Sequence, residues 1–531
     1  MKTKLDQIIK NIPEADKKNP TVIFLLELLE QQVETILLLK EQIQEVKDEN
    51  ARIKKQKPRP KIKPSKLTEK SKKKSSKKRS GSAKRKKTVN LEIHETKRIA
   101  PESIPPGSEF KGLKPYTVQG LEIRICNTLY QLEQWKTPNG QIISGKLPSG
   151  IDGHFSHTLK SYILYQYHHC HVTQPLLLEQ LREWSVDISS GQLSNILTEN
   201  KDLFHDEKDG ILFAGLKSSS HVNVDDTGAR HNGKNGYCTH IGNEFFAWFE
   251  STESKSRINF LKLLRAGKSD YVLNEDAFQY MINERLPRSS LTLLRNHPLK
   301  EFADRQQWEQ HLQELGISKP RHVKIATEGA LFGCVLSQIP RSLVIVSDAA
   351  GQFNILNHAL CWIHAERTLS KLIAPSAEKL QILEDVRKQV WQFYDELKAY
   401  KESPNENDKI RLQEKFDAIF TQQTDYQLLN LALKRLHANK AELLLVFDRP
   451  EIPLHNNLSE NDIREYVKRR KVSGSTRSEA GRRCRDTFTS LKKTCRKLGI
   501  SFWQYLEDRL SYKNSILSLS QLVEQASAAL G

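Results

Sequence analysis

Apolar residues recur at alternating steps of three and four positions between Val22 and Ile53. The ten positions of this repeat hold Val, Leu, Leu, Gln, Ile, Leu, Ile, Val, Asn and Ile, so eight of the ten are apolar. This spacing is typical of a helix that packs an apolar seam against a partner helix, and it predicts a coiled coil within residues 1–53. Asn50 occupies an a position, where a buried amide favours a two-stranded register. We therefore expect a homodimer or a higher oligomer, with an intramolecular helix hairpin as the alternative.

Residues 91–152 are rich in Pro and Gly and contain short alternating stretches such as Leu121–Ile125. This pattern predicts a small β-containing module. The pattern becomes helical over residues 153–216, where a short break separates segments 175–184 and 189–197. Such an arrangement is typical of a helix-turn-helix whose second helix is capped by Ser189, although an ordinary helix pair explains it equally well.

The pattern after residue 216 predicts an α/β core with a mixed sheet. A strand is expected over 219–225, and a hairpin of two strands turns at Gly242-Asn243. A helix is expected over 257–264. Leu343-Val344-Ile345-Val346 is a continuous branched apolar run, which is typical of a strand buried on both faces. Long charged helical patterns then follow, so the core divides into a first part (217–365), a helical insertion with a break at Pro404-Asn405 (366–450), and a C-terminal part (451–531).

Composition narrows the class of protein. Hydrophobic residues make up 37% of the chain, the mean hydropathy is −0.59, and no apolar run approaches the ~18 residues that a membrane span needs. The first twenty residues lack the apolar core of a secretory signal, so we expect a soluble cytoplasmic protein with no membrane partner. Seven cysteines, none in a CxxC pair, make structural disulfides and a cysteine zinc site unexpected.

One segment carries almost all of the net charge of +19. Residues 52–87 contain 19 Lys or Arg and a single acid, Glu69, whereas the rest of the chain has 64 basic and 63 acidic residues. Such a run does not pack into a core, so residues 54–90 are expected to be a basic disordered linker that binds a polyanion, nucleic acid above all. A solubilising linker or a localisation signal is the alternative. The expected DNA-binding residues here are Lys72, Lys73, Lys74, Lys77, Lys78, Arg79, Lys84, Arg85, Lys86 and Lys87.

Three carboxylates stand at the ends of elements that an α/β sheet brings together. Asp225 and Asp348 follow expected strands, and Glu460 opens a helix that continues as a basic segment with 13 Lys or Arg against three acids between residues 464 and 497. Converging carboxylates repel one another unless cations lie among them, and hard oxygen ligands suit Mg²⁺ or Mn²⁺. Two such ions catalyse in-line phosphoryl displacement. Each acid alone is also explained as a strand-end or helix-cap carboxylate.

The alternation of side chains along a strand distinguishes Asp225 from its neighbour. Asp226 shares a face with Val222 and Val224, whereas Asp225 shares the other face with Asn223. We therefore expect Asp225 to point toward Asp348, and Asp226 to take part in a turn through Thr227-Gly228.

Four segments, VDDTGAR, SDAAGQF, CWIHAER and HNNLSENDIR, occur in this order. They resemble the signature blocks of the transposases of insertion sequence family sixty-six, and the resemblance covers residues 158–506. That family consists of DDE transposases with a ribonuclease-H-like core. The resemblance implies that Asp225, Asp348 and Glu460 are the catalytic and metal-binding triad, served by two Mg²⁺ (or Mn²⁺) ions without a covalent protein intermediate.

The resemblance also sets the expected function. It implies a DNA transposase that cuts at the ends of a mobile element and joins the freed 3′ hydroxyls to target DNA, in the nucleoid of a bacterium or archaeon. Double-stranded DNA, further protomers and accessory proteins of the same element are the implied partners. A catalytically silent DNA-binding scaffold and a nuclease of the same core type are the alternatives.

The block CWIHAER places a cysteine and a histidine close together in the sequence. Cys361 and His364 stand one helical turn apart and are interpreted as part of a packed helix with a hydrogen-bonded His rather than as half a metal site.

Family members commonly carry a cysteine zinc module before the core, but 91–152 contains only Cys126, so no zinc is expected. The 123 positions from Asp225 to Asp348 predict an extra helical insertion within 267–341. Expected DNA contacts near Glu460 are Asn457, for which helix capping is the alternative, and Arg464, Lys468, Arg469, Arg470 and Lys471.

Overall fold

The computed structural model describes residues 91–148, 151, 153–374 and 376–529. The chain divides into two compact units, Met1–Val118 and Gln119–Gly531. In the first unit, the described residues 91–118 contain no helix or strand. The coiled coil expected within 1–53 and the basic linker expected at 54–90 lie outside the described residues. None of the helices in the described ranges is long and apolar enough to cross a membrane.

A mixed sheet forms the core of the second unit, which confirms the expected α/β class. Among the described residues this sheet has five strands in the order β5-β4-β3-β8-β9. Strands β3, β4 and β5 pair antiparallel, while β8 pairs parallel with both β3 and β9. The strands are β3 (His221–His231), β4 (Lys234–Gly242), β5 (Ala247–Thr252), β8 (Val344–Ser347) and β9 (Asn357–Leu360).

Strand β3 is longer than its sequence indicated. It continues through Asp226, Thr227 and Gly228 to His231, and the chain turns at Asn232-Gly233, where both residues have positive φ (47° and 76°). An Asn-Gly pair with positive φ is the usual two-residue connection of a hairpin. The expected turn at Thr227-Gly228 is therefore wrong, because Thr227 pairs with Cys238 and Gly228 with Tyr237 across the hairpin.

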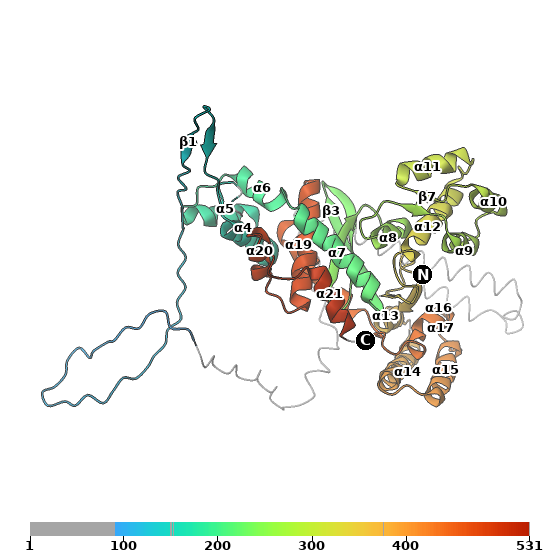
Figure 1. The fold of residues 1–531 in the computed structure, drawn as a ribbon. Coiled ribbons are helices and arrows are strands. Elements are labelled where there is room, and N and C mark those ends of the chain that lie inside the picture. The colour runs from blue at the N-terminus through green and yellow to red at the C-terminus, as the bar shows by residue number, and fades with distance from the viewer. Residues whose placement is uncertain (1–90, 149–150, 152, 375, 530–531) are drawn as a thin grey trace, which may run out of the picture. The chain divides into compact units, whose positions relative to one another are not determined.

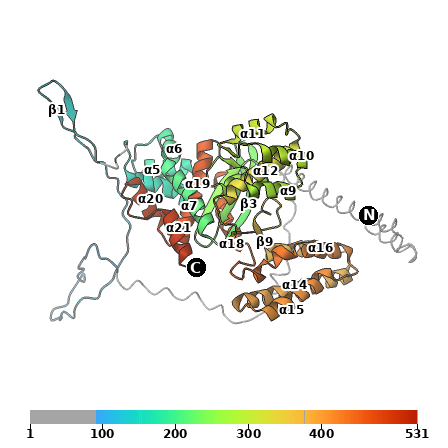
Figure 2. The ribbon, with the colours of Figure 1, turned by 45° about the vertical axis from the view of Figure 1, so that its right-hand side comes forward.

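Two helices from the C-terminal part pack on the sheet, and a third helix packs beside them; Figure 1 labels α19 and α7, and Figure 2 also labels α18. Helix α18 (Asn457–Ser473) packs on β3 and β4, α19 (Glu479–Lys497) packs on β5, and α7 (Asp202–Ser218) contacts α19 and β5. Helix α19 also satisfies the free edge of β5. The backbone N–H groups of Ala247, Phe249 and Ser251 donate to three α19 side chains spaced four residues apart, Thr494 (3.2 Å), Ser490 (2.9 Å) and Asp486 (2.8 Å). An edge covered in this way offers no template for another strand.

Helices before the sheet pack against the end of the chain. Helices α5 (Gln174–Glu183) and α6 (Ser190–Thr198) confirm the predicted helix pair, and Ser189 caps α6 in a capping box with Gln192. The other elements of this region are α4 (His157–Leu164), the π-helix η2 (Tyr165–His169), α20 (Phe502–Leu510) and α21 (Leu519–Ala528). In the segment where a small β module was expected, the described residues form one ribbon of β1 (Gln134–Lys136) and β2 (Ile142–Ser144), and Leu121–Ile125 is not a strand.

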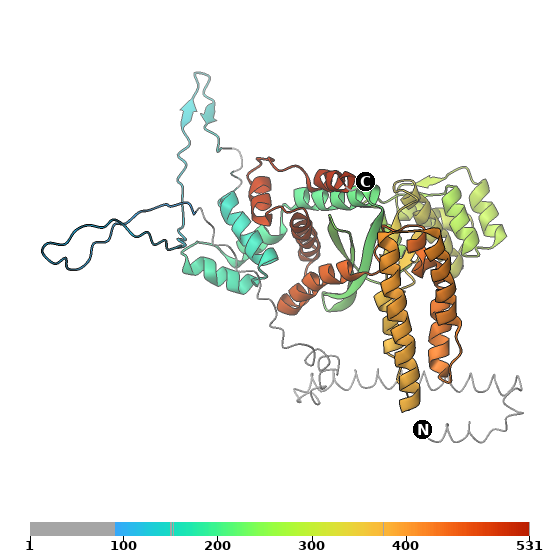
Figure 3. The same cartoon turned by 90° about the horizontal axis from the view of Figure 1, so that it is seen from below.

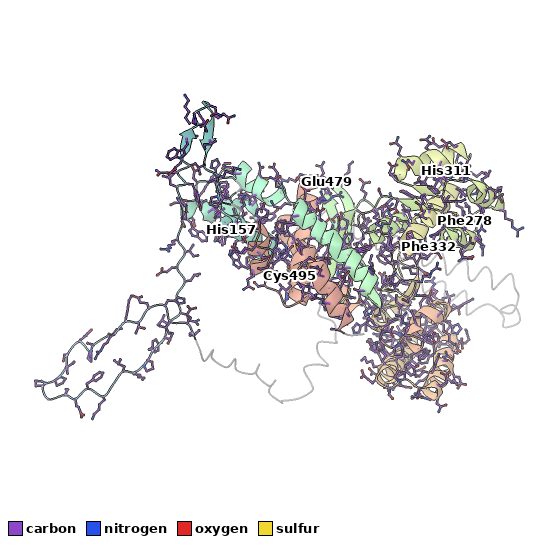
Figure 4. All side chains as sticks on the ribbon, viewed as in Figure 1. His157, Phe278, His311, Phe332, Glu479 and Cys495 are labelled. Carbon is purple, nitrogen blue, oxygen red and sulfur yellow. The ribbon has the colours of Figure 1, made fainter. Side chains whose placement is uncertain are left out.

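The segment between β5 and β8 contains the expected insertion. Its elements are α8 (Arg257–Leu264), β6 (Tyr271–Val272), α9 (Glu275–Asn283), α10 (Arg288–Asn296), β7 (Glu301–Phe302), α11 (Arg305–Glu314) and α12 (Pro320–Leu336). Figure 4 labels Phe278, His311 and Phe332 in this part, on α9, α11 and α12. Helix α12 approaches α9 closely because Gly329 has no side chain; a Cβ there would lie 2.6 Å from Met281. The sequence thus builds a packed subdomain rather than a loose loop.

A second helical insertion separates β9 from α18 and has its own hydrophobic core. It consists of α13 (Trp362–Ser370), α14 (Ala377–Glu402), α15 (Glu406–Thr421), α16 (Gln427–Ala438), α17 (Lys440–Leu443) and the 3₁₀ turn η3 (Leu445–Phe447). The long helices α14 and α15 lie side by side (Figures 2 and 3). The predicted break at Pro404-Asn405 is confirmed, and the Asn405 side chain accepts from Asp408 N–H to cap α15.

Candidate active site

Asp225 and Asp348 extend from neighbouring parallel strands at the same edge of the sheet. The last paired residues of β3 and β8 are Asn223 and Val346, so both aspartates lie two positions further along. Burial raises the pKa of Asp225 to about 7, and the negative charges of Asp348, Asp226 and Glu460 act in the same direction. The backbone N–H of Asp226 donates to Asp225 Oδ1 at 2.7 Å and partly offsets this effect. The carboxylates are therefore close enough to repel one another.

Asp226 faces the opposite side of β3 and has polar partners of its own. The hydroxyl of Thr239 donates to its Oδ1 at 2.5 Å, and Nε2 of Gln352 donates to its Oδ2 at 2.9 Å. Burial raises the pKa of Asp226, and these two hydrogen bonds oppose the rise. The two adjacent aspartates thus differ in surroundings, since only Asp226 is held by two side-chain donors.

Glu460 reaches the sheet because Asn456 anchors the start of α18. The Asn456 side chain is fully buried. Its Nδ2 donates to the carbonyl of Val224 at 2.7 Å, and its Oδ1 accepts from Asn223 Nδ2 at 2.9 Å. Its backbone N–H donates to Cys361 Sγ at 3.1 Å. Asn456 stands at the N-cap without a side-chain cap bond, so its amide positions the helix on β3 instead of capping it.

Helix α13 supplies two residues that contact Glu460. Nη1 of Arg367 donates to Glu460 Oε1 at 3.0 Å, and His364 Nε2 lies 3.6 Å from the same oxygen. Arg367 also bonds His364 at 3.1 Å. Burial lowers the pKa of His364, and the charge of Arg367 lowers it further. His364 is thus the hydrogen-bonded histidine of a packed helix, and Arg367 is a site residue that the sequence alone did not single out.

The donor set is compatible with a hard divalent cation. Asp225, Asp348 and Glu460 offer carboxylate oxygens only, which suit Mg²⁺ or Mn²⁺. The pKa of Asp225 is raised by burial first and by the neighbouring carboxylates second, and a cation would counter both effects. As the side chains stand, the described residues contain no group of three His, Cys, Asp or Glu residues arranged to hold a metal ion. Glu460 is held by Arg367 instead. A cation that uses Glu460 Oε1 as a ligand would therefore compete with Arg367 for that oxygen.

The basic residues of α18 fall on different sides of the helix. Asn457, Arg464, Lys468 and Lys471 are exposed, and Arg470 donates to the carbonyl of Gly228 on β3. Arg469 is only 3% exposed, with its guanidinium 3.9 Å from the centre of the Tyr167 ring. The expectation that Arg469 contacts DNA phosphate therefore does not fit its position, because it points into the protein. The expected DNA-binding residues between Lys72 and Lys87 lie outside the described residues.

Much of the basic segment that follows α18 is internal. Asp462 lies 2.8 Å from both Lys493 and Lys497, and Glu465 lies 2.7 Å from Lys492. The contact of His240 with Asp462 and the hydrogen bond from His171 to Glu465, followed by these lysines, hold the pKa of Asp462 and of Glu465 well below the usual range, against the effect of burial. The lysines of α19 thus neutralise the buried acids of α18 and fix the helix that carries Glu460.

Comparison with known proteins finds one matching family and one similar protein. The model of the transposase IS66 family matches residues 335–483. An uncharacterized protein y4jO of Sinorhizobium fredii (strain NBRC 101917 / NGR234) is 44% identical over 317 residues, which cover 59% of this chain and 99% of the relative. The chain belongs to the transposase IS66 family. The part matched by the model of this transposase family contains Asp348, Arg367 and Glu460, whereas Asp225 lies before it.

Proposed function

We propose that this member of the transposase IS66 family is an active DNA transposase, which cuts DNA at the ends of a mobile element and joins the freed 3′ hydroxyls to target DNA. The observation that supports the proposal is that β3, the residue after β8 and the start of α18 carry Asp225, Asp348 and Glu460, with β3 paired to β8 and α18 tied to β3 by Asn456. The strand order, with three antiparallel strands followed by two parallel ones, supports a ribonuclease-H-like core.

The three acids would hold two Mg²⁺ or Mn²⁺ ions. When bound, such ions activate the attacking oxygen and stabilise the leaving oxygen of a phosphoryl displacement. The protein positions the acids: Asn456 ties α18 to β3, and the two parallel strands set Asp225 beside Asp348. Because the carboxylates serve as ligands, water or a DNA hydroxyl is the nucleophile and no covalent protein intermediate forms.

Binding of double-stranded DNA is supported by cations near Glu460. Arg464, Lys468 and Lys471 are exposed on α18, where they can contact phosphates on either side of the cut. The basic linker adds contacts that do not depend on sequence. The N-terminal heptad repeat would pair protomers, as holding two element ends together requires. We also propose that accessory proteins of the same element take part and that the protein acts in the cytoplasm.

The test is incubation of the purified protein with the DNA that flanks its gene, in Mg²⁺, followed by mapping of nicks and joined products. An active transposase yields nicks at defined ends and joined strands. Nicks without joined products would indicate a nuclease of the same core type, and DNA binding without nicks would indicate a silent scaffold. The Asp225→Asn variant is the matched control, since it removes one negative charge with little change in volume.

A further inference from the structure

A pocket of about 500 Å³ lies between the first insertion and the loop that follows Asp348. The start of α8, the start of α12 and the end of α9 form its walls. Its charged lining residues are Lys255, Arg257, Glu284, Arg321, Lys324 and Glu328. Its volume falls in the range of sites that hold a nucleotide-sized molecule.

The lining is basic, with four cations and two acids. Arg257 is paired with Glu284 at 2.9 Å. Lys255, Arg321 and Lys324 are exposed, and Lys324 Nζ lies 3.8 Å from Glu328. Arg321 has no hydrogen bond or ion pair with any residue in the described part of the chain. Lys255 Nζ lies 5.1 Å from the centre of the Tyr237 ring, so Arg321 alone among these three exposed cations has no partner in the described part of the chain.

Two helix N-termini meet at this pocket. Helix α8 starts at Arg257 after the cap Ser256, and α12 starts at Pro320, directly before Arg321. Neither of these two helices has an acidic residue in its first turn. Basic side chains at a helix N-terminus add to the partial positive charge of the helix, which is unfavourable unless an anion is present. The charge distribution thus favours a phosphate group.

A buried carboxyl group adds a second, independent requirement. Glu328 lines the pocket and is 2% exposed. Its Oε2 accepts from the hydroxyl of Tyr280 at 3.0 Å, whereas its Oε1 has no hydrogen bond among the described residues and lies 3.8 Å from Lys324 Nζ. A buried acceptor without a donor is unfavourable. A phosphate that engages Lys324 draws this cation from Oε1, so a ligand that carries an N–H donor as well as an anionic group suits the pocket.

The pocket is connected to the candidate active site through the loop after Asp348, on the side of β3 that Asp226 faces. Gln352, four residues after Asp348, lines the pocket and donates to Asp226. Nη2 of Arg257 donates to the carbonyl of Gly351 at 2.9 Å, which ties the start of α8 to the same loop. A DNA strand that passes the carboxylates can therefore place a neighbouring nucleotide in the pocket.

We propose that this pocket binds one nucleotide of the DNA strand held at the carboxylates, with its phosphate at Lys255, Arg321 and Lys324 and a base N–H donor at Glu328 Oε1. The proposal rests on the proposed function and adds to it a role for the first insertion. It applies to a nucleotide within a strand, not to a free nucleotide, because the pocket is connected to the site where the strand is cut.

The test uses the full chain and DNA duplexes with a photoreactive thymidine analogue at successive positions around the cleaved junction. Crosslinks are mapped by mass spectrometry to the peptides that contain Lys255 or Arg321. We expect the analogue to crosslink to one of these peptides from at least one position. In the Arg321→Ala/Lys324→Ala variant the yield of that crosslink should fall about tenfold, since each lost cation removes a charge-assisted phosphate contact. The control Arg288→Ala/Lys388→Ala removes two exposed cations outside the pocket and should keep the crosslink.

Absence of a crosslink to either peptide, or equal loss in both double variants, would overturn the inference. Loss of the crosslink on addition of excess free deoxynucleoside monophosphate would also overturn it, because the pocket would then take a free nucleotide. Nicking is read in the same samples. Nicks without the crosslink mean that the inference alone fails, whereas the crosslink without Mg²⁺-dependent nicks means that the catalytic function alone fails. If the wild-type chain does not bind DNA, both the inference and the proposed function fail.

Discussion

Asp225 and Asp348 occupy equivalent positions on two neighbouring parallel strands, each two residues beyond the pair formed by Asn223 and Val346. The strand pairing therefore brings Asp225, within β3, level with Asp348, the first residue after β8. Helix α18 contributes Glu460 only after the chain has passed through a complete helical insertion. The position of the third acid accordingly depends on Asn456, Cys361 and Arg367 rather than on strand pairing.

The Asp225-Asp226 pair gives the sharpest test of the proposed triad. We expect Asp225→Asn to abolish cleavage and strand transfer while DNA binding persists, because the charges of both Asp348 and Glu460 act on this carboxylate. Asp226→Asn should retain measurable activity, since Asp226 is held by Thr239 and Gln352 on the other side of the strand. Cleavage assays of both variants in Mg²⁺ and Mn²⁺ measure the difference. The reverse result, with Asp226→Asn inactive and Asp225→Asn active, would reject this assignment.

Neighbouring cations of α18 should separate structural from DNA-binding roles. Arg469→Ala should lower the free energy of unfolding by about 2 to 4 kcal/mol, because it removes a buried guanidinium from the Tyr167 ring and carbonyl. Lys468→Ala should leave stability within about 0.5 kcal/mol and weaken DNA binding, because its side chain is exposed. Urea unfolding and DNA titration measure the two effects. Equal stability of both variants would contradict the buried position of Arg469.

The basic linker should supply binding that does not depend on DNA sequence. If about eight of its cations neutralise phosphates, deletion of residues 52–87 should flatten the salt dependence by roughly 7 log units of affinity per log unit of salt. DNA titrations over a series of salt concentrations measure this slope, for flanking DNA and for an unrelated sequence alike. An unchanged slope would show that the linker does not contact DNA in the complex.

A buried histidine should make stability depend on pH. The His205 ring bonds the Thr487 hydroxyl at 2.7 Å, and burial lowers the pKa of His205 to about 4, with Arg483 and Lys208 acting in the same direction. In the unfolded chain its pKa is near 6.5, so below that pH the unfolded state binds the proton first. Stability is therefore lost as pH falls from about 6.5 to about 4.

The loss contributed by His205 at pH 5 should be about 1 to 2 kcal/mol. Urea unfolding of the wild type and of His205→Asn at pH 7.5 and pH 5 measures it, and the variant should lose less on acidification. His94, which is exposed in the other unit, provides the control His94→Asn with an unchanged pH dependence. An identical loss in the wild type and in His205→Asn would contradict the prediction.

Local patterns predicted the elements of the sheet better than their extent. The branched run at Val344–Val346 and the alternation around Val222 and Val224 identified two central strands because burial on the sheet requires such residues. The polar stretch from Asp226 to Gly228 indicated a turn by composition. It remains a strand because β4 pairs with it residue by residue and Thr239 hydrogen-bonds Asp226. Pairing with a distant strand thus outweighs the local preference for a turn.

Side-chain directions and long-range contacts were beyond the sequence pattern. The direction of Arg469 follows from the packing of α18 against the region of Tyr167, which no periodicity of α18 alone reveals. The contact between Arg367 and Glu460 joins residues 93 positions apart across the second insertion. The block CWIHAER pointed to the region, but only the placement of α13 shows that Arg367 neutralises the third acid.

That contact leads to a prediction about metal affinity. Arg367 competes with a cation for Glu460 Oε1, so Arg367→Gln should tighten Mn²⁺ binding by roughly three- to tenfold, the range expected for removing one partly exposed charged contact. Arg464 lies 3.9 Å from Glu460 and is more exposed, so Arg464→Gln should leave the affinity unchanged and serves as the control. Calorimetric titration of the DNA-free protein with Mn²⁺ measures binding without requiring activity. Glu460→Gln should weaken binding, because it removes a ligand. An Arg367→Gln variant with unchanged or weaker affinity would mean that Arg367 does not compete with the metal, and that Glu460 keeps this partner in the metal-bound site.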